Sequence, residues 1–339
     1  MTRVPVIIPT LCRYEHFKRC VESLQRNKLA DETELFIGLD YPAKESHVEG
    51  YKKIKEYIDN GISGFLKVNV IRYEQNVGSS KNSLLLREAV YERFDRYIYS
   101  EDDNEFAPSF LEYMNYYMTK YEADEEIVAV TGYSYPFDKN GMDGDIYMLN
   151  TYFAAFGYGI WKRKQDKMLE QISLENLERS LADSSLMANL RKASFNQFGN
   201  FVKGMVGYTN DVVIDGKARC CDLTRGLQMF FEDKKMIFPK VSLVRNWGYD
   251  GSGVNCDKME VKENQRIHYR NFDFTTQELD ERKEWGTNPK LTGMKQQEIN
   301  RRLQDYFYIP KKEKIRTMAA YCAVRVLGRK KVSEIIKGK

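Results

Sequence analysis

Three acidic residues, Glu101, Asp102 and Asp103, directly follow the stretch 96–100, which has the apolar pattern of a buried strand. Ligands of parallel α/β sheets bind beyond the carboxyl ends of the strands, so carboxylates at such a place are positioned for chemistry. Neighbouring carboxylates repel one another unless a cation lies among them. Hard oxygen ligands suit Mg²⁺ or Mn²⁺, which would bridge them to a diphosphate. For these residues taken alone, a solvated acidic turn with an Asp as helix cap is the alternative.

The segment around the acidic residues resembles a known motif. It reads Tyr99-Ser-Glu-Asp-Asp-Asn-Glu-Phe-Ala-Pro-Ser-Phe110. This is similar to the DxD-type motif of nucleotide-sugar glycosyltransferases with the GT-A fold, in particular to the EDD segment of N-acetylglucosaminyltransferase I and of family 2-like bacterial transferases of surface polysaccharide assembly. The resemblance implies that Asp103 is the metal ligand and that Glu101 and Asp102 hold the ribose or the donor sugar. The metal would neutralise charge on the departing UDP.

Residues that precede the acidic cluster fit the same resemblance. The loop after the first predicted strand, the end of the second strand and an Asn-x-Gly turn correspond to the family's contacts with the nucleotide. Each feature alone is a common turn signal, but their order and spacing agree with the motif. The residues that the resemblance places at the nucleotide sugar are Pro9, Thr10, Arg13, Asp40, Asn76 and Gly78.

Asp222 is the candidate general base. Inverting transfer needs a group that takes the proton of the acceptor hydroxyl, and in the resembled group a catalytic Asp opens the helix before a short turn and a strand with a proline near its start, here Pro239. Cys221 departs from the family pattern, in which an aromatic residue commonly precedes the Asp. An ordinary N-cap is the other reading of Asp222. Rival bases are Asp211, Asp215 and Asp250.

Aromatic residues are the candidates for the sugar and acceptor pocket. The stretch 153–162 resembles a G-x-G-x-W-K segment at the edge of the sugar site of the bacterial relatives, and within it we expect Tyr158 and Trp161 to be open to a pyranose face. Trp247 begins a Gly-rich loop that reads as a lid over the donor or as a surface turn. His268 is a candidate late metal ligand.

The order of elements predicts an α/β fold. Apolar runs that read as strands alternate with helical periodicity through the first half of the chain, which is typical of βαβ units. We expect a GT-A, Rossmann-like, mostly parallel sheet flanked by helices, with a helical C-terminal extension. The predicted strands are 4–8, 34–39, 65–72, 96–100, 127–132 and 236–244, and Pro108 is predicted to begin a helix. The predicted domains are a catalytic domain 1–260, with halves 1–135 and 136–260, and an extension 261–339.

The charge of the chain is unevenly distributed. The 339 residues carry a net charge of +4, but 311–339 alone hold ten Lys/Arg against two Asp/Glu, so the rest is acidic. Apolar residues recur at helical spacing in this tail. It is therefore either a basic amphipathic helix for an anionic membrane or a helix docked on the body. No signal peptide, membrane span or disulfide pattern is apparent, so we expect a cytoplasmic protein, peripheral at most at the inner face of the membrane.

The resemblance thus implies a metal-dependent, inverting hexosyltransferase that moves sugar from a nucleotide sugar, a UDP-sugar, to a glycan or lipid-linked glycan in surface polysaccharide biosynthesis. We expect no binding of nucleic acid. A sugar nucleotidyltransferase shares the α/β core, but it would need a Gly-rich basic phosphate loop after the first strand, where this chain has Pro9-Thr-Leu-Cys-Arg13. A non-catalytic glycan-binding protein would use the aromatic surface without a metal. Release of UDP from UDP-sugars with Mn²⁺ would separate these functions.

Overall fold

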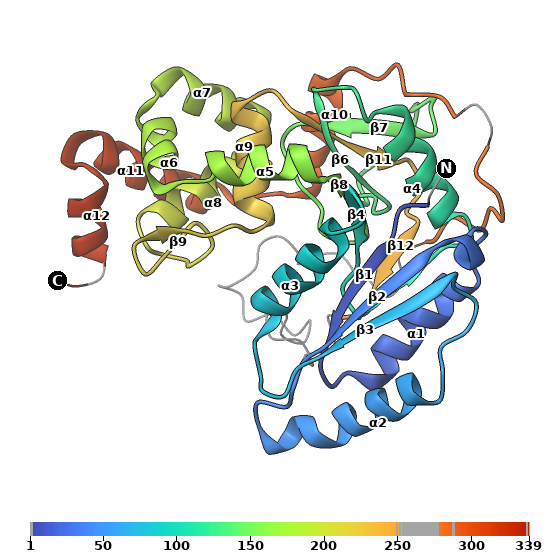
Figure 1. Ribbon diagram of the computed structural model, residues 1–339. Helices are drawn as coiled ribbons and strands as arrows, with labels where there is room; N and C mark the ends of the chain where they lie inside the picture. The colour runs from blue at the N-terminus through green and yellow to red at the C-terminus, as the bar shows by residue number, and fades with distance from the viewer. Residues whose placement is uncertain are drawn as a thin grey trace.

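The centre of the molecule is an eight-stranded sheet. The computed structural model describes residues 3–248, 250, 252, 278–286, 289–336 and 338. The strands of the sheet are β1 Val6–Thr10, β2 Glu34–Leu39, β3 Lys67–Arg72, β4 Arg96–Tyr99, β6 Ile127–Thr131, β7 Ile146–Leu149, β8 Tyr158–Trp161 and β11 Lys235–Pro239. Their order is β3-β2-β1-β4-β8-β6-β11-β7 (Figure 1).

Most of the sheet is parallel, as expected. β1 pairs in parallel with β2 and β4, and β2 pairs in parallel with β3. β8 runs antiparallel to both of its neighbours, β4 and β6, while β11 is parallel to β6 and antiparallel to β7. The carboxyl ends of β1, β2 and β4 therefore meet at one edge, where the loops that follow them can form a common site.

Helices cover both faces of this sheet. α1 Tyr14–Gln25, α2 Val48–Asp59, α3 Ser79–Tyr91 and α4 Phe110–Lys120 alternate with its strands, and short 3-10 helices span Ala30–Glu32 and Glu45–His47. Because side chains alternate along a strand, Val6 and Ile8 pack in one apolar cluster with α1, whereas Ile7 packs in a second cluster with Leu86 of α3. The expected α/β fold, a mostly parallel sheet flanked by helices, is confirmed.

Two predicted elements differ in the structure. The predicted strand 236–244 is divided: β11 ends at Pro239, and the separate strand β12 Val244–Asn246 pairs antiparallel with β5 Asn104–Phe106. The helix after the acidic residues is α4, which begins at Phe110 and not at Pro108. The two-stranded sheet of β5 and β12 is important for the site, because it brings the chain after 244 against the turn after β4.

The remaining helices form the C-terminal half of the fold. They are α5 Lys162–Gln171, α6 Leu174–Ala182, α7 Ser184–Ala193, α8 Phe195–Met205, α9 Asp222–Phe231, α10 Gln296–Tyr306, α11 Lys311–Leu327 and α12 Arg329–Ile336, with a hairpin of β9 Val213–Ile214 and β10 Lys217–Ala218. Figure 1 shows α6, α7, α8, α11 and α12 gathered at one end of the molecule, which confirms the helical C-terminal part. No helix in the described ranges is long and apolar enough to cross a membrane.

Candidate functional site

The acidic residues after β4 lie against the loop after β1. The Arg13 guanidinium forms ion pairs with both aspartates: one nitrogen contacts Asp102 Oδ1, and Nη1 lies 2.7 Å from Asp103 Oδ2. Thr10 Oγ1 donates to the other Asp102 oxygen at 2.8 Å. β1 and β4 are parallel neighbours, so the end of each strand delivers its side chains to the same place. Thr10, Arg13 and the acidic residues are thus brought together, as the sequence predicts.

The second sheet supplies further contacts to Asp103. Asn246, at the end of β12, donates from Nδ2 to Asp103 Oδ1 at 2.6 Å and to Asn104 Oδ1 at 3.0 Å. The Trp247 N–H donates to the Asp103 carbonyl oxygen at 2.8 Å. A Cβ placed on Gly248 would stand 2.1 Å from Asp103 Oδ2, so any larger residue here would have to displace this carboxylate. The sequence did not reveal Asn246, although its place directly before the Gly-rich loop was a usable signal.

The site holds more negative than positive charge. Asp102 and Asp103 are only 5% and 6% exposed. Burial raises the pKa of Asp102 in spite of the attraction of Arg13. Burial also raises the pKa of Glu101 well above its usual range, and repulsion by Asp103, Asp222 and Asp102 adds to the effect. One guanidinium therefore faces three carboxyl groups, and either a proton on Glu101 or a further cation would relieve the repulsion.

The carboxylate oxygens here are the type of ligand that a hard divalent cation prefers, but they do not form a ready metal site, because Asp103 is already engaged. Both of its carboxylate oxygens are taken, one by Arg13 and one by Asn246. Within the described residues, no group of three or more His, Cys, Asp or Glu side chains could hold a metal ion, and the Glu101 carboxylate has neither a hydrogen bond nor an ion pair. Surplus charge on oxygen donors is what Mn²⁺ or Mg²⁺ binds. A metal at Asp103 would replace its contact with Arg13. His268 lies outside the described residues.

Asp40, at the end of β2, holds the Asn-x-Gly turn. Its carboxylate accepts hydrogen bonds from the backbone N–H groups of Val77 and Gly78, each at 2.9 Å, and from Asn76 Nδ2 at 3.1 Å. The Tyr41 N–H adds a fourth bond at 2.8 Å. Gly78 has a φ of +81°, which favours glycine. The structure thus brings Asp40, Asn76 and Gly78 together, and the Asp40 oxygens are used to fix the turn.

Pro9 lies within β1 and does not end it. It pairs in register with Gly38 of β2, and it is half-buried one residue before Thr10. The strand continues to Thr10, whose carbonyl oxygen accepts a hydrogen bond from the Asp40 N–H at 2.9 Å. Pro9 therefore supports the loop that carries Arg13, because it is part of the strand from which this loop leaves.

The expectation that Tyr158 and Trp161 are open is wrong. They are 3% and 4% exposed, respectively. Trp161 is opposite Arg96 at the start of β4 and therefore lies at the edge of the sheet away from the acidic residues, with its Nε1 donating to the Met118 carbonyl oxygen at 3.2 Å. Tyr158 is opposite Tyr99, at the end of β4 that leads into the acidic residues. Both rings are buried because β8 lies inside the sheet and protein covers both faces of the sheet.

Asp222 begins α9 without serving as its cap. Cys221 occupies the N-cap position, and its backbone N–H donates to Thr224 Oγ1 at 3.0 Å. The reading of Asp222 as an ordinary N-cap is therefore wrong. Asp222 is exposed on the surface as a residue, but the protein atoms packed around its carboxylate remove part of its hydration and raise its pKa to about 6, against the attraction of Arg225 and Arg219. Such a carboxylate is ionised near neutral pH and still basic enough to accept a proton.

Arg225, one turn into α9, is a site residue that the sequence did not reveal. Its Nη1 donates to the Tyr158 hydroxyl at 2.9 Å, and its guanidinium lies 5.0 Å from the centre of the Phe153 ring. It also lowers the pKa of Asp222 by attraction. The signal in the sequence was its spacing of three residues from Asp222, which places the two side chains on one face of the helix.

The rival bases have less suitable surroundings. Asp250 Oδ2 lies 2.9 Å from His16 Nε2. Although burial raises its pKa, hydrogen bonds from Ser252 and His16 outweigh this and lower the pKa to about 2. Asp211 and Asp215 are exposed around the β9–β10 hairpin. The partners of Asp250 thus keep its pKa low, whereas the pKa of Asp222 is raised toward neutrality.

Trp247 fixes the chain beside the acidic residues. Its indole Nε1 donates to Glu105 Oε2 at 2.8 Å, and the Arg19 guanidinium stacks 4.4 Å from its ring centre. The described part of the Gly-rich loop comprises residues 247, 248, 250 and 252. Trp247 is half-buried and thus holds the loop in contact with α1 and β5.

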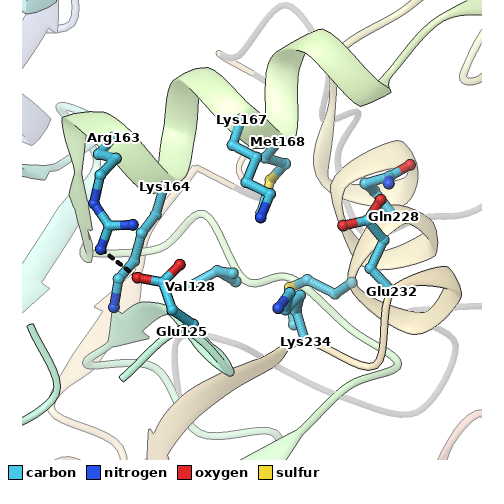
Figure 2. Close-up of a pocket in the computed structure, with 10 residues that line it drawn as sticks. Glu125, Val128, Arg163, Lys164, Lys167, Met168, Gln228, Glu232 and Lys234 are labelled. Carbon is cyan, nitrogen blue, oxygen red and sulfur yellow. Dashed lines mark ion pairs between the residues drawn. The ribbon is translucent and has the colours of Figure 1, made fainter. Parts of the chain in front are cut away.

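A separate pocket lies between α5 and α9 (Figure 2). Its lining residues are Glu125, Val128, Arg163, Lys164, Lys167, Met168, Gln228, Met229, Glu232 and Lys234, and its volume is about 30 Å³. Lys164 Nζ donates to three carbonyl oxygens there, at 2.7–2.8 Å. A space of this size holds a water molecule or two, not a nucleotide sugar.

Comparison with known proteins finds distant structural likeness. No protein-family model and no curated protein matches the chain. Among solved structures, TarS of S. aureus in complex with UDP-GlcNAc matches 38% of this chain and 33% of its own, with 12% identity and a TM-score of 0.31. The mannosyltransferase PcManGT of Pyrobaculum calidifontis, in complex with GDP-Man and Mn²⁺, matches 50% of this chain and 46% of its own, with 15% identity and a TM-score of 0.31. The chain spans less than half of either structure, so the functional argument rests on the strand-end site.

Proposed function

We propose that the chain is a metal-dependent, inverting glycosyltransferase of GT-A type, in the hexosyltransferase class. It transfers sugar from a nucleotide sugar, a UDP-sugar, to a glycan or lipid-linked glycan in surface polysaccharide biosynthesis. One observation carries the proposal: Thr10 and Arg13 meet Asp102 and Asp103 at the carboxyl ends of the neighbouring strands β1 and β4, and the Asp222 charge helps to raise the pKa of Glu101 beside them. A cation with a diphosphate on one side and a base on the other is the arrangement that sugar transfer requires.

Each residue of the site has a role in this proposal. Thr10 and Arg13 contact the nucleotide, and Asp40 supports them by holding the Asn76–Gly78 turn beside the base. Asp103 holds the metal, whereas Glu101 and Asp102 orient the ribose or the donor sugar. A divalent cation at Asp103 would supply a Lewis acid that neutralises charge on the leaving diphosphate.

The proposed reaction is a single displacement. The acceptor hydroxyl oxygen forms a bond with the anomeric carbon on the face opposite the nucleotide, and its proton passes to the Asp222 carboxylate. The bond between the anomeric carbon and the diphosphate oxygen breaks, and the nucleoside diphosphate leaves with the electron pair. The ionised form of Asp222 is present at neutral pH because its pKa is about 6, and Arg225 holds the carboxylate by attraction.

Release of UDP tests the proposal. We expect the full chain to release UDP from one member of a UDP-sugar panel when Mn²⁺ and a glycan acceptor are present, and Asp222→Asn to bind the same donor without releasing UDP. Asp250→Asn is the matched control, because Asp250 pairs with His16 and retains no role in transfer. Formation of pyrophosphate from UTP and a sugar phosphate would instead establish a nucleotidyltransferase, and glycan binding without UDP release would establish a binding protein.

The proposed partners include a membrane surface. A transferase that extends a lipid-linked glycan works where its acceptor is anchored, and residues 311–339 carry an excess of Lys and Arg. Cations near anionic lipid each contribute to attraction. We therefore include peripheral contact of this segment with anionic lipid in the proposed function.

A further inference from the structure

Helix α11 has two apolar faces. One face packs on the helical end of the molecule: Thr317 and Val324 are buried, and the Tyr321 ring lies 5.3 Å from the Phe198 ring of α8. Met318, Ala320 and Ala323 are half-buried against the same apolar cluster. The helix therefore docks on the body, which is one of the two alternatives that its sequence allows.

The opposite face of α11 carries a second apolar stripe. It consists of Ile315, Ala319, Cys322 and Val326, whose spacings of four, three and four residues place them in one row along the helix. All four are exposed, Ile315 to 61% and Val326 to 81%. At 100° per residue this row lies on the side of the helix turned away from Thr317 and Val324. Docking therefore leaves the stripe uncovered.

Cations border the exposed stripe. Lys311, Lys312 and Arg316 are exposed on α11 at helical positions next to it, and within the described residues they have no ion pair or hydrogen bond through their side chains. Other charged side chains of this segment are used differently: Glu313 pairs with Lys203, and Arg329 pairs with Glu178 at 2.7 Å. Glu313 and Arg329 thus have oppositely charged partners in the protein, whereas the three cations beside the stripe have none among the described residues.

We propose that this face of α11, the stripe with Lys311, Lys312 and Arg316, binds the surface of an anionic lipid bilayer. Apolar side chains between free cations match lipid tails beneath anionic headgroups. A second copy of the chain is disfavoured as the binding partner of this face, because two such faces would bring like charges together.

The length of α11 indicates how it would bind. The helix has 17 residues, about 25 Å, which is shorter than the roughly 30 Å of a bilayer core, so it lies along the surface. The inference rests on the proposed function for its biological sense, but it is tested without donor or acceptor.

Vesicle binding tests the apolar part of the proposal. The full chain is sedimented with vesicles of phosphatidylcholine alone or mixed with phosphatidylglycerol, and we expect binding to the mixed vesicles only. Ile315→Asp should reduce this binding at least tenfold, because it places a charge in the stripe. Leu66→Asp is a matched control, since Leu66 is also 61% exposed but follows α2 at the other end of the molecule. Equal losses in the two variants would overturn the assignment of this face.

Removal of the cations tests the electrostatic part. Each Lys or Arg near an anionic surface contributes about 1 kcal/mol, so replacing Lys311, Lys312 and Arg316 with Gln should weaken binding on the order of a hundredfold. The control replaces Lys52, Lys53 and Lys55 of α2, which removes the same charge elsewhere. Unchanged binding of the first variant, or dimers in light scattering that Ile315→Asp dissolves, would refute the membrane proposal. Asp222→Asn should still bind vesicles, so failure of the catalytic proposal is recognised separately.

Discussion

Arg13 and Asp103 form an ion pair with 2.7 Å between Nη1 and Oδ2, which joins the loop after β1 to the turn after β4. The two side chains are 20% and 8% exposed, so solvent screens the pair little. The guanidinium also neutralises Asp102. Arg13 is therefore the counter-charge that lets this acidic turn fold, and it stands where the proposed metal would act.

Replacement of Arg13 should make the fold depend on metal. Arg13→Gln leaves two buried aspartates without their partner, which costs about 3–5 kcal/mol of unfolding free energy. Mn²⁺ should restore part of this loss, because it supplies the missing positive charge. We expect the thermal midpoint of the variant to rise more with Mn²⁺ than that of the unmodified chain, in a calorimetric melt without nucleotide.

Arg96→Gln is the control for this experiment. Arg96 pairs with Asp95 and Glu122, which are 68% and 50% exposed. Its removal should cost less stability and leave the Mn²⁺ effect unchanged. The same Mn²⁺ effect in both variants would show that the ion does not act at the Arg13 site.

Gly248 should tolerate no side chain. A Cβ there would stand 2.1 Å from Asp103 Oδ2, so Gly248→Ala must displace the carboxylate or the loop. We expect at least a tenfold loss of metal-dependent UDP affinity in titration calorimetry. At Gly286 a Cβ meets nothing within 4 Å, so Gly286→Ala should bind UDP normally. Normal affinity in Gly248→Ala would mean that Asp103 can move without harm.

Local patterns predicted the parallel half of the sheet well. Phe17, Cys20, Val21 and Leu24 recur at helical spacing, and all are buried under the sheet. The predicted strand 34–39 is identical to β2. In these segments the same apolar residues that determine the local structure also form the core, so sequence and structure agree.

Long-range pairing was harder to predict. β12 is three residues long and forms only with β5, far away in the chain, so periodicity could not separate it from β11. Asn246 reaches Asp103 through this pairing. The interpretation of Trp161 failed for a related reason, since only the register of β8 against β4 shows which edge of the sheet it occupies. The order of residues along the chain indicates a motif, but the pairing register of the strands determines which residues of the motif are in contact.

The two aspartates should contribute differently to UDP binding. Asp103→Asn should abolish the increase of UDP affinity that Mn²⁺ gives, because a neutral amide is a poor ligand for a hard cation. Asp102→Asn should weaken UDP binding with and without Mn²⁺, because its carboxylate orients Arg13 and Thr10. Calorimetric titration of UDP with and without Mn²⁺ distinguishes them. Retention of the Mn²⁺ effect in Asp103→Asn would refute its assignment as the ligand.

Asp40 should contribute to the stability of the fold as well as to nucleotide binding. It is 3% exposed and accepts bonds from the 76–78 turn. Asp40→Ala leaves these donors without an acceptor, and we expect a loss of about 2–4 kcal/mol in urea unfolding. Asp59→Ala should cause no measurable change, because its ion pairs are at the surface. Equal stability of the two variants would contradict the role of Asp40 in holding the turn.

Sugar transfer should depend on the ionisation of Asp222. Its pKa is raised to about 6 because burial disfavours the charged form. A base must be unprotonated, so kcat at saturating donor and Mn²⁺ should fall about tenfold per pH unit below pH 6 and level off above it. Asp250→Asn should keep this profile, whereas a rate that is constant from acid to neutral pH would exclude Asp222 as the base.

The pH dependence of unfolding is a second test of the raised pKa of Asp222, and it does not depend on activity. Because the pKa of Asp222 is about 6 in the folded chain and 3.8 without this environment, the native state binds more protons than the unfolded chain between these two pH values. Its contribution to stability is therefore favourable at low pH and is lost as the pH rises through about 6. Asp222→Asn has no charge to bury, so we expect it to melt at a higher temperature than the unmodified chain at pH 8 and at a similar temperature at pH 4. A lower melting temperature at pH 8 would show that Asp222 stabilises the fold, and the pKa shift would then have the opposite sign.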